Sequence, residues 1–349
     1  MIQTYFLGAN TKEGFFSLYG GFPPRNGDFL HIIKGGPGTG KSGFMRKIGL
    51  AAEKQGLDVE YVLCSGDPDS LDGVYIPALK TAWVDGTVPH VTEPVCFGVD
   101  SDYVNLGRFC RLPFSPEEKE EIQRINTSYK LLYARAYGYL SAAAHLGNAS
   151  LPELFGPAEQ AAIGRRIDNI LDRNLGRSFL CGGKKSARFL SALSCQGEYR
   201  LPGEISKLCK LIYQFDDGLG GAGAALEYAA EGALKRGAEI IVCPSPLEPA
   251  VLEAVLIPSA GLALLGGGFE LEEVRHIRID ALIPTEKQQS LRPERREALR
   301  ARERALALAL EKLGQAKALH DELESFYIPH MDFPALTKYT EGEIRRFLK

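Results

Sequence analysis

The 349-residue sequence lacks cysteine pairs, long apolar runs and a strong net charge, and each absence excludes a class of protein. No C-x-x-C pair and no Cys/His cluster at zinc spacing is present, so the cysteines indicate free thiols in a reducing cytosol. The seven cysteines are Cys64, Cys96, Cys110, Cys181, Cys195, Cys209 and Cys243. A net charge of −3 gives no reason to expect an electrostatic hold on nucleic acid or on an acidic membrane surface.

The most apolar stretch, AVLIPSAGLALLGGGF at 254–269, is interrupted by Pro258 and by several glycines. It falls short of the roughly 20 apolar residues that a membrane-spanning helix needs. The opening MIQTYFLGANTKEGFF has no basic segment followed by an apolar core, so no signal peptide is expected. With 45% hydrophobic residues, the chain can bury proper cores. We therefore expect a soluble, cytoplasmic protein without a membrane or nucleic-acid partner.

A glycine-rich loop follows the first strongly apolar strand pattern. From Asp28 to Cys64 the sequence predicts a strand, a glycine loop, a helix that stops at Gly56 and a second strand, which together make a βαβ unit. Within it, Gly35–Ser42 reads GGPGTGKS and matches the P-loop pattern G-x-x-x-x-G-K-[ST]. Such a loop points backbone N–H groups at phosphate oxygens, and the following helix adds the positive end of its dipole.

The P-loop pattern gives individual residues a role toward ATP and Mg²⁺. Lys41 would reach the β and γ phosphates as a point charge, and the Ser42 hydroxyl would ligate Mg²⁺. Lys41 is therefore also a predicted catalytic residue. The predicted nucleotide-binding residues are Gly35, Gly36, Pro37, Gly38, Thr39, Gly40, Lys41, Ser42 and Gly43.

Carboxylates follow the neighbouring strand patterns, where a P-loop enzyme needs one to hold the metal. Asp85 ends the apolar run TAWVD and is the predicted metal-holding and catalytic carboxylate, beside Ser42; the alternative is an ordinary Asp-Gly turn. Asp67, Asp69 and Asp72 come just past the second strand, at the same sheet edge as the P-loop in a parallel topology. Asp67 or Asp69 could orient an attacking water, take a proton from an acceptor or bind Mg²⁺, although turn chemistry explains both equally well.

Four further side chains could reach the phosphates. His90 and Thr87 follow Asp85 and could contact the γ phosphate or the attacking water, the alternative being a plain surface-loop histidine. Arg108 and Arg111 are the candidate arginines for charge that develops on the phosphoryl group, the alternative being ordinary solvated arginines.

Long helical patterns follow the strand-rich part of each half. SPEEKEE opens with a capping box, in which Ser115 is the N-cap, Pro116 the first helical residue and Glu118 the third. The pattern predicts a long helix over 115–141 and a second helix around 157–171 that folds back on it. In the C-terminal segment 293–326, arginines alternate with glutamates, which indicates a solvated helix face.

The second half of the chain repeats the plan of the first. FLGANTKEGF from Phe6 resembles FLSALSCQGEY from Phe189, at an offset of 183. DPDSLDGVYIP, which ends at Pro77, aligns with EPAVLEAVLIP, which ends at Pro258, at an offset of 181. At that same offset the helix stop Gly56 again falls on a glycine. The sequence therefore predicts two tandem copies of one α/β unit.

The second copy lacks the residues that would hold phosphate and metal. At an offset of 181 the pairs are Gly35 and Asp216, Gly36 and Asp217, Gly40 and Gly221, Lys41 and Ala222, Ser42 and Gly223, and Asp85 and Gly266. Two carboxylates would stand near the phosphate position, and like charges about 4 Å apart repel by about 4 kcal/mol at an effective dielectric near 20. Ordinary nucleotide binding is not expected there.

The same region contains Gly218, Gly220 and Gly223 in the order G-x-G-x-x-G, which is also the spacing of a dinucleotide-binding fingerprint. That fingerprint needs an acidic residue at the end of the second strand to bind the ribose, but EIIVCPSP supplies cysteine and proline there. The repeat offers the better explanation, in which these glycines are the remains of a P-loop.

With these motifs the chain resembles a little-characterised family of bacterial tandem P-loop ATPases, whose units carry a lead-in FxSAxTxxGF, a P-loop and DPDSLDxVxIP. The resemblance covers nearly the whole chain and implies ATP binding and hydrolysis at Gly35–Ser42. It implies an α/β fold of tandem duplicated P-loop NTPase units with mainly parallel sheets, each followed by a helical arm. The intact unit would span residues 1–178 and the degenerate unit 179–349.

The leading hypothesis is a Mg²⁺-dependent ATPase in which water attacks in line at one P-loop and the degenerate unit is a structural or regulatory partner. A first alternative is a small-molecule or nucleotide kinase that uses Asp67 or Asp69 as the acceptor's base. A second alternative is an ATP-gated interaction module whose helical arms, Ser115–Leu175 and Leu291–Lys349, bind a protein partner.

Overall fold

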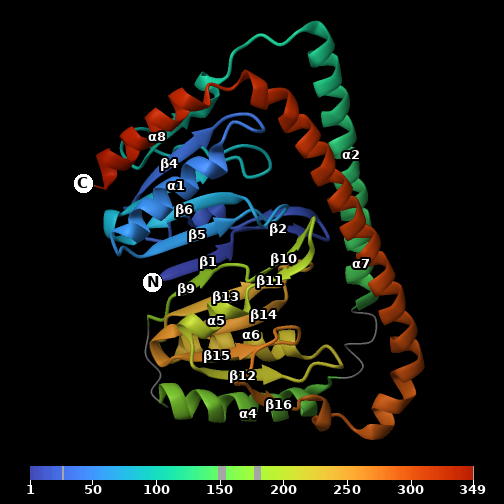
Figure 1. The fold of residues 1–349 in the computed structure, drawn as a ribbon. Helices are drawn as coiled ribbons and strands as arrows, with labels where there is room; N and C mark the ends of the chain where they lie inside the picture. The colour runs from blue at the N-terminus through green and yellow to red at the C-terminus, as the bar shows by residue number, and fades with distance from the viewer. Residues whose placement is uncertain (26, 148–154, 177–181, 349) are drawn as a thin grey trace.

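The computed structural model of the chain describes residues 1–25, 27–147, 155–176 and 182–348. Cys181 and the expected boundary between residues 178 and 179 lie outside the described residues. Two six-stranded sheets lie one above the other, and a pair of long helices runs along one side of both (Figure 1). The predicted α/β class is confirmed.

The first sheet has the strand order β1-β5-β6-β7-β4-β8. Its strands are β1 (Ile2–Phe6), β4 (Phe29–Lys34), β5 (Val59–Leu63), β6 (Leu71–Ile76), β7 (Thr81–Asp85) and β8 (Ser101–Asn105). A separate hairpin of β2 (Gly8–Thr11) and β3 (Gly14–Ser17) follows β1, and the short helices are η1 (Tyr19–Gly21), η2 (Pro77–Leu79) and η3 (Leu106–Phe109). Helix α1 (Lys41–Lys54) joins β4 to β5 and packs its apolar face on the sheet, with Phe44, Met45 and Ile48 buried.

The second sheet has the order β16-β12-β15-β14-β13-β9, which is the first order read from its other end. Its strands are β9 (Lys185–Ala187), β12 (Leu211–Phe215), β13 (Ile240–Pro244), β14 (Leu252–Ile257), β15 (Leu262–Leu265) and β16 (Arg275–Ile277). The hairpin of β10 (Ser191–Ser194) and β11 (Gly197–Arg200), the helices α5 (Pro202–Leu208) and α6 (Ala222–Lys235), and η4 (Pro258–Ala260) complete this half. Helix α6 and strand β14 lie 181 residues after α1 and β6, so the predicted duplication is confirmed.

Both sheets are mixed, and most of their strand pairs are parallel, as the mainly parallel topology expected from the sequence requires. Strand β6 runs antiparallel to β5 and β7, and β14 does the same in the second sheet, while the other pairs in each sheet are parallel. Asp72, which was expected with Asp67 and Asp69 just past the second strand, lies within β6 and is buried. Gly73 follows it on the strand, where a Cβ would lie 3.2 Å from Val62.

The two halves meet about an approximate twofold axis. Phe6 and Phe189, which the repeat places at equivalent positions, donate their N–H groups to each other's carbonyls at 3.0 and 2.9 Å. Two further hydrogen bonds between the halves are equivalent to each other by the repeat. They run from Lys12 N–H to Leu247 C=O (3.0 Å) and from Cys195 N–H to Gly66 C=O (3.1 Å). The contact between the halves is therefore isologous, as in a twofold dimer, although one chain forms both sides.

The helical arms are exchanged between the halves. The arms consist of α2 (Pro116–Gly147), α4 (Pro157–Leu175), η5 (Asp280–Leu282), α7 (Thr285–Tyr327), η6 (Ile328–His330) and α8 (Phe333–Phe347). Helix α2 leaves the first sheet and runs alongside α7, which leaves the second (Figure 1). Helix α4 then packs on α6 of the second half, and α8 packs on α1 of the first. The expectation that α4 folds back on α2 is wrong.

The seam between α2 and α7 explains why α2 prefers this partner. Ala136 and Leu140 of α2 are buried in one cluster with Leu306, Ala309 and Leu313 of α7. Alanines at helical spacing let two helix backbones approach closely, and the leucines fill the remaining space. Two long helices thus bury a continuous apolar stripe that neither could bury alone.

The start of α2 confirms the predicted capping box. The Ser115 hydroxyl accepts a hydrogen bond from Glu118 N–H at 3.1 Å, and the Glu118 carboxylate accepts one from Ser115 N–H at 2.7 Å. The helix then continues beyond the predicted end at Ser141 to Gly147.

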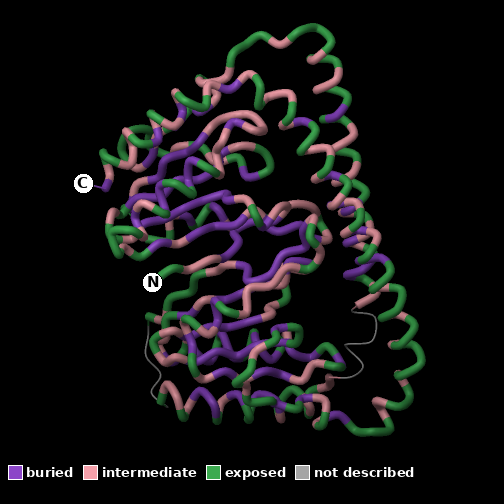
Figure 2. The backbone as a smooth tube through the Cα atoms, in the orientation of Figure 1, coloured by how far each residue is buried: buried purple, intermediate pink, exposed green. Residues whose placement is uncertain are grey.

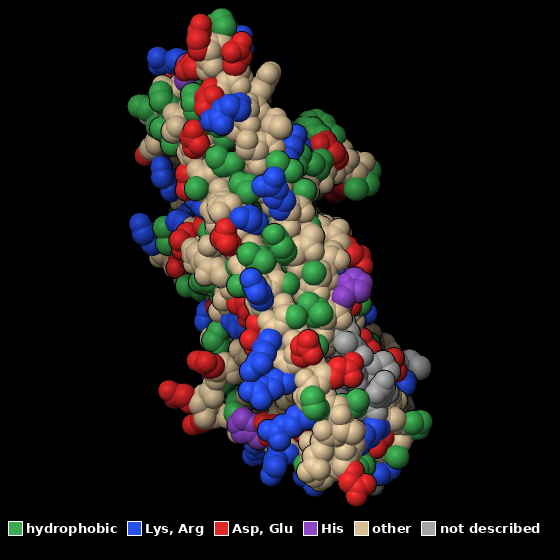
Figure 3. All heavy atoms as spheres, turned by 90° about the vertical axis from the view of Figure 1, so that its right-hand side faces the viewer, with side chains coloured by type: hydrophobic (Ala, Val, Ile, Leu, Met, Phe, Trp, Pro, Cys, Tyr) green, Lys and Arg blue, Asp and Glu red, His purple; other side chains and the backbone are tan. Residues whose placement is uncertain are grey.

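Burial follows the strands of both sheets, while the long helices expose most of their outer surface (Figure 2). On that outer face acidic and basic side chains are interspersed, with Lys and Arg gathered toward the lower end of the view (Figure 3). In the part of the chain that the structure describes, no helix is both long and apolar enough to cross a membrane.

Candidate functional site

The glycine-rich loop lies at the carboxyl end of β4 and leads directly into α1. Gly38 (φ +65°) and Gly40 (φ +82°) hold left-handed backbone conformations that other residues rarely adopt. Together they curl the chain so that Lys41 starts the helix. The loop therefore combines a curled backbone with a helix N-terminus, the arrangement that binds anions.

Lys41 is folded over this loop. Its Nζ donates hydrogen bonds to the carbonyls of Gly35 (3.2 Å) and Gly36 (2.9 Å) and lies 3.6 Å from Oδ2 of Asp85. Asp85 reaches this point because β7 pairs parallel with β4, so both strands end at the same edge. The lysine and the carboxylate that the sequence analysis assigned to phosphate and metal thus lie together.

Ser42 and Thr87 fix the surroundings of that pair. The Ser42 hydroxyl accepts a hydrogen bond from Leu71 N–H at 2.9 Å, which places it beside the start of β6. The other oxygen of Asp85, Oδ1, accepts hydrogen bonds from the N–H and the hydroxyl of Thr87 at 2.9 and 2.6 Å. Thr87 therefore orients Asp85 with Oδ2 free to face Lys41.

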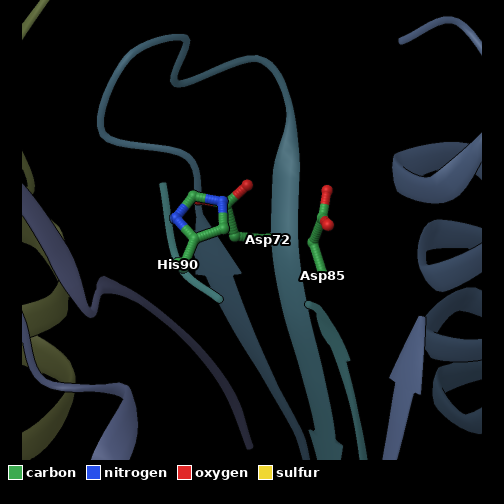
Figure 4. A group of neighbouring side chains, drawn as sticks. All are labelled: Asp72, Asp85 and His90. Carbon is green, nitrogen blue, oxygen red and sulfur yellow. The ribbon is translucent and has the colours of Figure 1, made fainter. Parts of the chain in front are cut away.

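A second carboxylate and a histidine complete a buried cluster with Asp85. Asp72, Asp85 and His90 are 5%, 8% and 6% exposed, and they come from β6, the end of β7 and the loop after it (Figure 4). One ligand atom from each residue lies within 4.8 Å of the other two. The alternative of a surface-loop histidine is wrong for His90. The buried position of Asp72 could have been predicted from the strand pattern LDGVYI at 71–76, of which it is the second residue.

Aromatic side chains and charge set the state of His90. Its ring lies against the rings of Phe15 and Tyr19, with centroids 5.4 and 5.1 Å away. The Tyr19 hydroxyl also donates to Oδ2 of Asp72 at 3.2 Å. Burial by itself lowers the pKa of His90, but the carboxylates of Asp72 and Asp85 oppose it, and the pKa is raised overall.

Asp67 and Asp69 lie outside this cluster. Oδ2 of Asp67 is 3.4 Å from Nζ of Lys317 on α7, and Oδ2 of Asp69 accepts a hydrogen bond from the Gln196 amide at 2.8 Å. These two carboxylates therefore connect the turn after β5 to the exchanged arm and to the second half.

The two candidate arginines contact α8 and its cap. The Arg108 guanidinium lies over the rings of Phe109 and Tyr339, at 4.8 and 4.3 Å from their centroids. Arg111 is exposed and lies 3.7 Å from the carboxylate of Asp332, the N-cap of α8. Cation–π contact and ion pairing thus use both guanidiniums in the arrangement described here.

The end of the exchanged arm covers the glycine-rich loop. Oε1 of Glu324 accepts a hydrogen bond from Gly38 N–H at 3.1 Å. A Cβ placed on Gly36 would lie 3.0 Å from the Tyr327 ring. This contact could not be predicted from the sequence, because the partners are 286 positions apart and no local pattern links them.

The residues of the loop fit a bound Mg²⁺–triphosphate once the part of the arm that covers it, with Glu324 and Tyr327, has moved. The Gly38 N–H already donates a hydrogen bond to the carboxylate of Glu324, so this amide is oriented to bind an anion. The glycines add no side chains of their own, and Lys41, Ser42 and Asp85 supply the cation, hydroxyl and carboxylate that such a group needs. Phosphate oxygens would then replace the carboxylate of Glu324.

The equivalent loop of the second half holds its own carboxylate. Oδ1 of Asp217 accepts a hydrogen bond from Ala222 N–H at 3.1 Å, at the start of α6. Burial raises the pKa of Asp217 to about 6, while N–H groups of the loop act in the opposite direction. The carboxylate of Asp217 thus accepts hydrogen bonds from the backbone N–H groups that a phosphate would need.

A cavity of about 720 Å³ nevertheless adjoins this second loop. Gly218 and Gly223 line it, and Arg200, Arg295 and Arg302 contribute positive charge to its wall. Because Asp217 holds the loop amides, the glycine spacing there does not by itself make a dinucleotide site.

Comparison of the chain with protein-family models, with curated proteins and with solved structures found no match.

Proposed function

We propose that the protein binds ATP with Mg²⁺ at Gly35–Gly43 and hydrolyses it. The observation that carries the proposal is the position of Lys41, which lies between the loop carbonyls and the carboxylate of Asp85. In this role the Lys41 ammonium offsets charge that develops on the β and γ phosphates, and the loop amides bind their oxygens. A bound Mg²⁺ would neutralise negative charge on the phosphates.

The remaining residues have supporting roles in this proposal. Ser42 would contribute its hydroxyl to the metal, and Asp85, oriented by Thr87, would be the carboxylate that helps to hold it. The second half is a structural partner whose loop is closed by Asp217.

The test is release of phosphate from ATP by the purified chain with Mg²⁺. Lys41→Ala should remove the activity, because the negatively charged phosphates then lose the ammonium group that offsets their charge. Lys47→Ala, which changes a lysine of the same helix, is the matched control and should hydrolyse ATP at the wild-type rate. A Lys41→Ala protein as active as the wild type would refute the proposal.

An ATP-gated interaction module is a second candidate, and one observation favours it. The arm that would bind a partner also contacts the loop, through Glu324 and Gly38. Nucleotide binding would then move the end of α7 and change the surface that the arm presents. Tight ATP binding without turnover, together with altered hydrogen exchange in α7, would select this function over hydrolysis.

The kinase alternative finds less support. Its candidate bases, Asp67 and Asp69, contact Lys317 and Gln196. A phosphate acceptor would first have to displace those partners.

A further inference from the structure

We propose that Asp72, Asp85 and His90 form a binding site for one divalent first-row transition metal ion, such as Mn²⁺, Co²⁺ or Zn²⁺, which it holds without nucleotide. The inference deepens the proposed function and rests on it only for the use of the ion in hydrolysis, since the site adjoins Lys41 and Ser42. Binding of the ion itself needs no ATP.

The spacing of the ligand atoms is the first argument. Nε2 of His90 lies 3.5 Å from Oδ2 of Asp72. That is longer than the 2.7–3.2 Å, roughly, of a hydrogen bond between nitrogen and oxygen. Two ligands bonded to one ion at about 2.1 Å lie about 3.4 Å apart across a tetrahedral angle. The pair is thus spaced as two ligands of one ion.

The burial of His90 is the second argument. The residue is only 6% exposed, and its Nδ1 has no hydrogen-bond partner within the described ranges. Buried polar groups normally have partners, since each one left without a partner is destabilising. The rings of Phe15 and Tyr19 hold the imidazole in place with Nε2 directed at the carboxylate. Nε2 is thus the ring nitrogen held toward a ligand position, and an ion bound there would replace the present pairing of His90 with Asp72.

Charge and ligand chemistry indicate which ion fits. Asp72 and Asp85 bring two negative charges into a buried space, and Lys41 supplies one positive charge at 3.6 Å from Asp85. With a neutral imidazole these groups sum to one negative charge, which favours a cation at this place, and a bound divalent ion would bring the sum to +1. Mg²⁺ prefers oxygen ligands and keeps most of its waters, whereas imidazole binds the ions from Mn²⁺ to Zn²⁺ with increasing affinity toward copper. The imidazole therefore favours a transition metal over Mg²⁺.

Comparison with the second half shows that the site belongs to the first half alone. At an offset of 181, Asp72 falls on Glu253 and Asp85 falls on Gly266. The carboxyl of Glu253 is 12% exposed and accepts a hydrogen bond from the Ser191 hydroxyl, and no second carboxylate stands in the place of Asp85. One repeat thus has three ligands, and its copy has one.

Another group, His320, Asp321 and Glu324 on α7, also has metal-ligand spacing. Its members already have partners, because Asp321 pairs with Lys317 and Glu324 binds the Gly38 amide. Asp321 is also exposed, so solvent competes with any ion there. The group on α7 is therefore the alternative metal site that the experiment must distinguish from Asp72, Asp85 and His90.

The experiment titrates the full-length, nucleotide-free protein with Co²⁺, followed by visible absorption, and with Mn²⁺, followed by electron paramagnetic resonance. We expect one saturable equivalent, with Mg²⁺ in large excess displacing it poorly. His90→Ala should weaken binding at least tenfold. His320→Ala and His145→Ala, which alter the competing group and an exposed histidine of α2, should bind as the wild type does. Wild-type binding no stronger than that of His90→Ala, or loss of binding in His320→Ala alone, would overturn the proposal.

Two additions keep the test decisive. If His90→Ala does not fold, pulsed electron paramagnetic resonance of the wild type with Mn²⁺ should detect the coupling of one imidazole nitrogen, and its absence from both the wild type and His320→Ala would refute the site. Lys41→Ala should bind Co²⁺ at least as tightly as the wild type, since it removes a positive charge 3.6 Å from Asp85. Metal binding without ATP hydrolysis would leave this site standing while the proposed function fails.

Discussion

The carboxylate of Glu324 accepts a hydrogen bond from the backbone N–H of Gly38 at 3.1 Å, so a side chain of α7 lies where the glycine-rich loop would hold phosphate. Glu324 follows the second sheet in sequence, while Gly38 belongs to the first. The exchange of arms thus brings a negative charge from one half to the anion-binding loop of the other.

Replacement of Glu324 by alanine should tighten nucleotide binding. The carboxylate and a phosphate compete for one amide, and a hydrogen bond to a charged group contributes about 1.5–3 kcal/mol. Since every 1.4 kcal/mol or so is tenfold in affinity, we expect about a tenfold lower Kd for a non-hydrolysable ATP analogue with Mg²⁺. Isothermal titration calorimetry measures it.

Glu322→Ala is the matched control for this change. Glu322 lies on the same helix, is 45% exposed, and its nearest cation, Arg124, is 4.0 Å away. Its removal changes the charge of α7 by the same amount but frees no N–H group of the glycine-rich loop. The affinity for the ATP analogue should therefore stay within twofold of the wild-type value. An unchanged or weaker affinity in Glu324→Ala would show that the contact does not compete with nucleotide.

Asp217→Asn should change how stability depends on pH. The folded-state pKa of Asp217 is raised to about 6 from a usual value of 3.8, so the folded state binds the proton more tightly than the unfolded state. Stability from this group is present below pH 4 and falls as the pH rises through 6, by up to about 3 kcal/mol. Asparagine does not ionise, so the stability of the variant does not fall in this pH range on account of residue 217.

Urea denaturation of the wild type and Asp217→Asn at intervals from pH 4 to pH 8 measures the effect. The stability of the variant relative to the wild type should rise between pH 4 and 6 and then level off. Glu253, whose pKa burial raises to about 7, is present in both proteins and cancels in the difference. A difference that does not vary with pH would mean that Asp217 is ionised normally in the fold.

The sequence predicted the duplicated α/β plan because strand, loop and helix patterns are local and recur at a fixed offset. The capping box of α2 was predictable for the same reason, since Ser115 and Glu118 lie within one helical turn. The exchange of the arms was not predictable, because an apolar helix stripe does not specify its partner. The fold-back expected for α4 failed at that point.

The site divides along the same line. Lys41 and Asp85 were placed together because parallel neighbouring strands end at one edge. Asp72 was grouped with Asp67 and Asp69 past the second strand, whereas it lies within the buried antiparallel strand β6, beside Asp85 and His90. Only the tertiary contact of His90 with Phe15 and Tyr19, from a different segment, buries that histidine.

Two glycines on different helices should respond oppositely to alanine. A Cβ on Gly49 of α1 would lie 2.4 Å from the Tyr61 ring, so Gly49→Ala should destabilise the fold by about 1–3 kcal/mol through overpacking. A Cβ on Gly138 of α2 meets nothing within 4 Å, and Gly138→Ala should stabilise by about 0.5–1 kcal/mol because alanine restricts the unfolded chain. Denaturation in urea compares them, and equal signs would contradict the packing described for α1.

Phe6 and Phe189 offer a test of the approximate twofold axis. Both side chains are fully buried where the halves meet, and their backbones bond reciprocally. Phe6→Ala and Phe189→Ala should each destabilise the protein by about 3–5 kcal/mol, the range for a buried phenylalanine. Phe97→Ala, at a side chain 68% exposed, should stay within about 0.5 kcal/mol of wild type. Urea denaturation measures these changes in the free energy of unfolding. If Phe6→Ala or Phe189→Ala lowered it no more than Phe97→Ala does, the two halves would not depend on this contact for their packing.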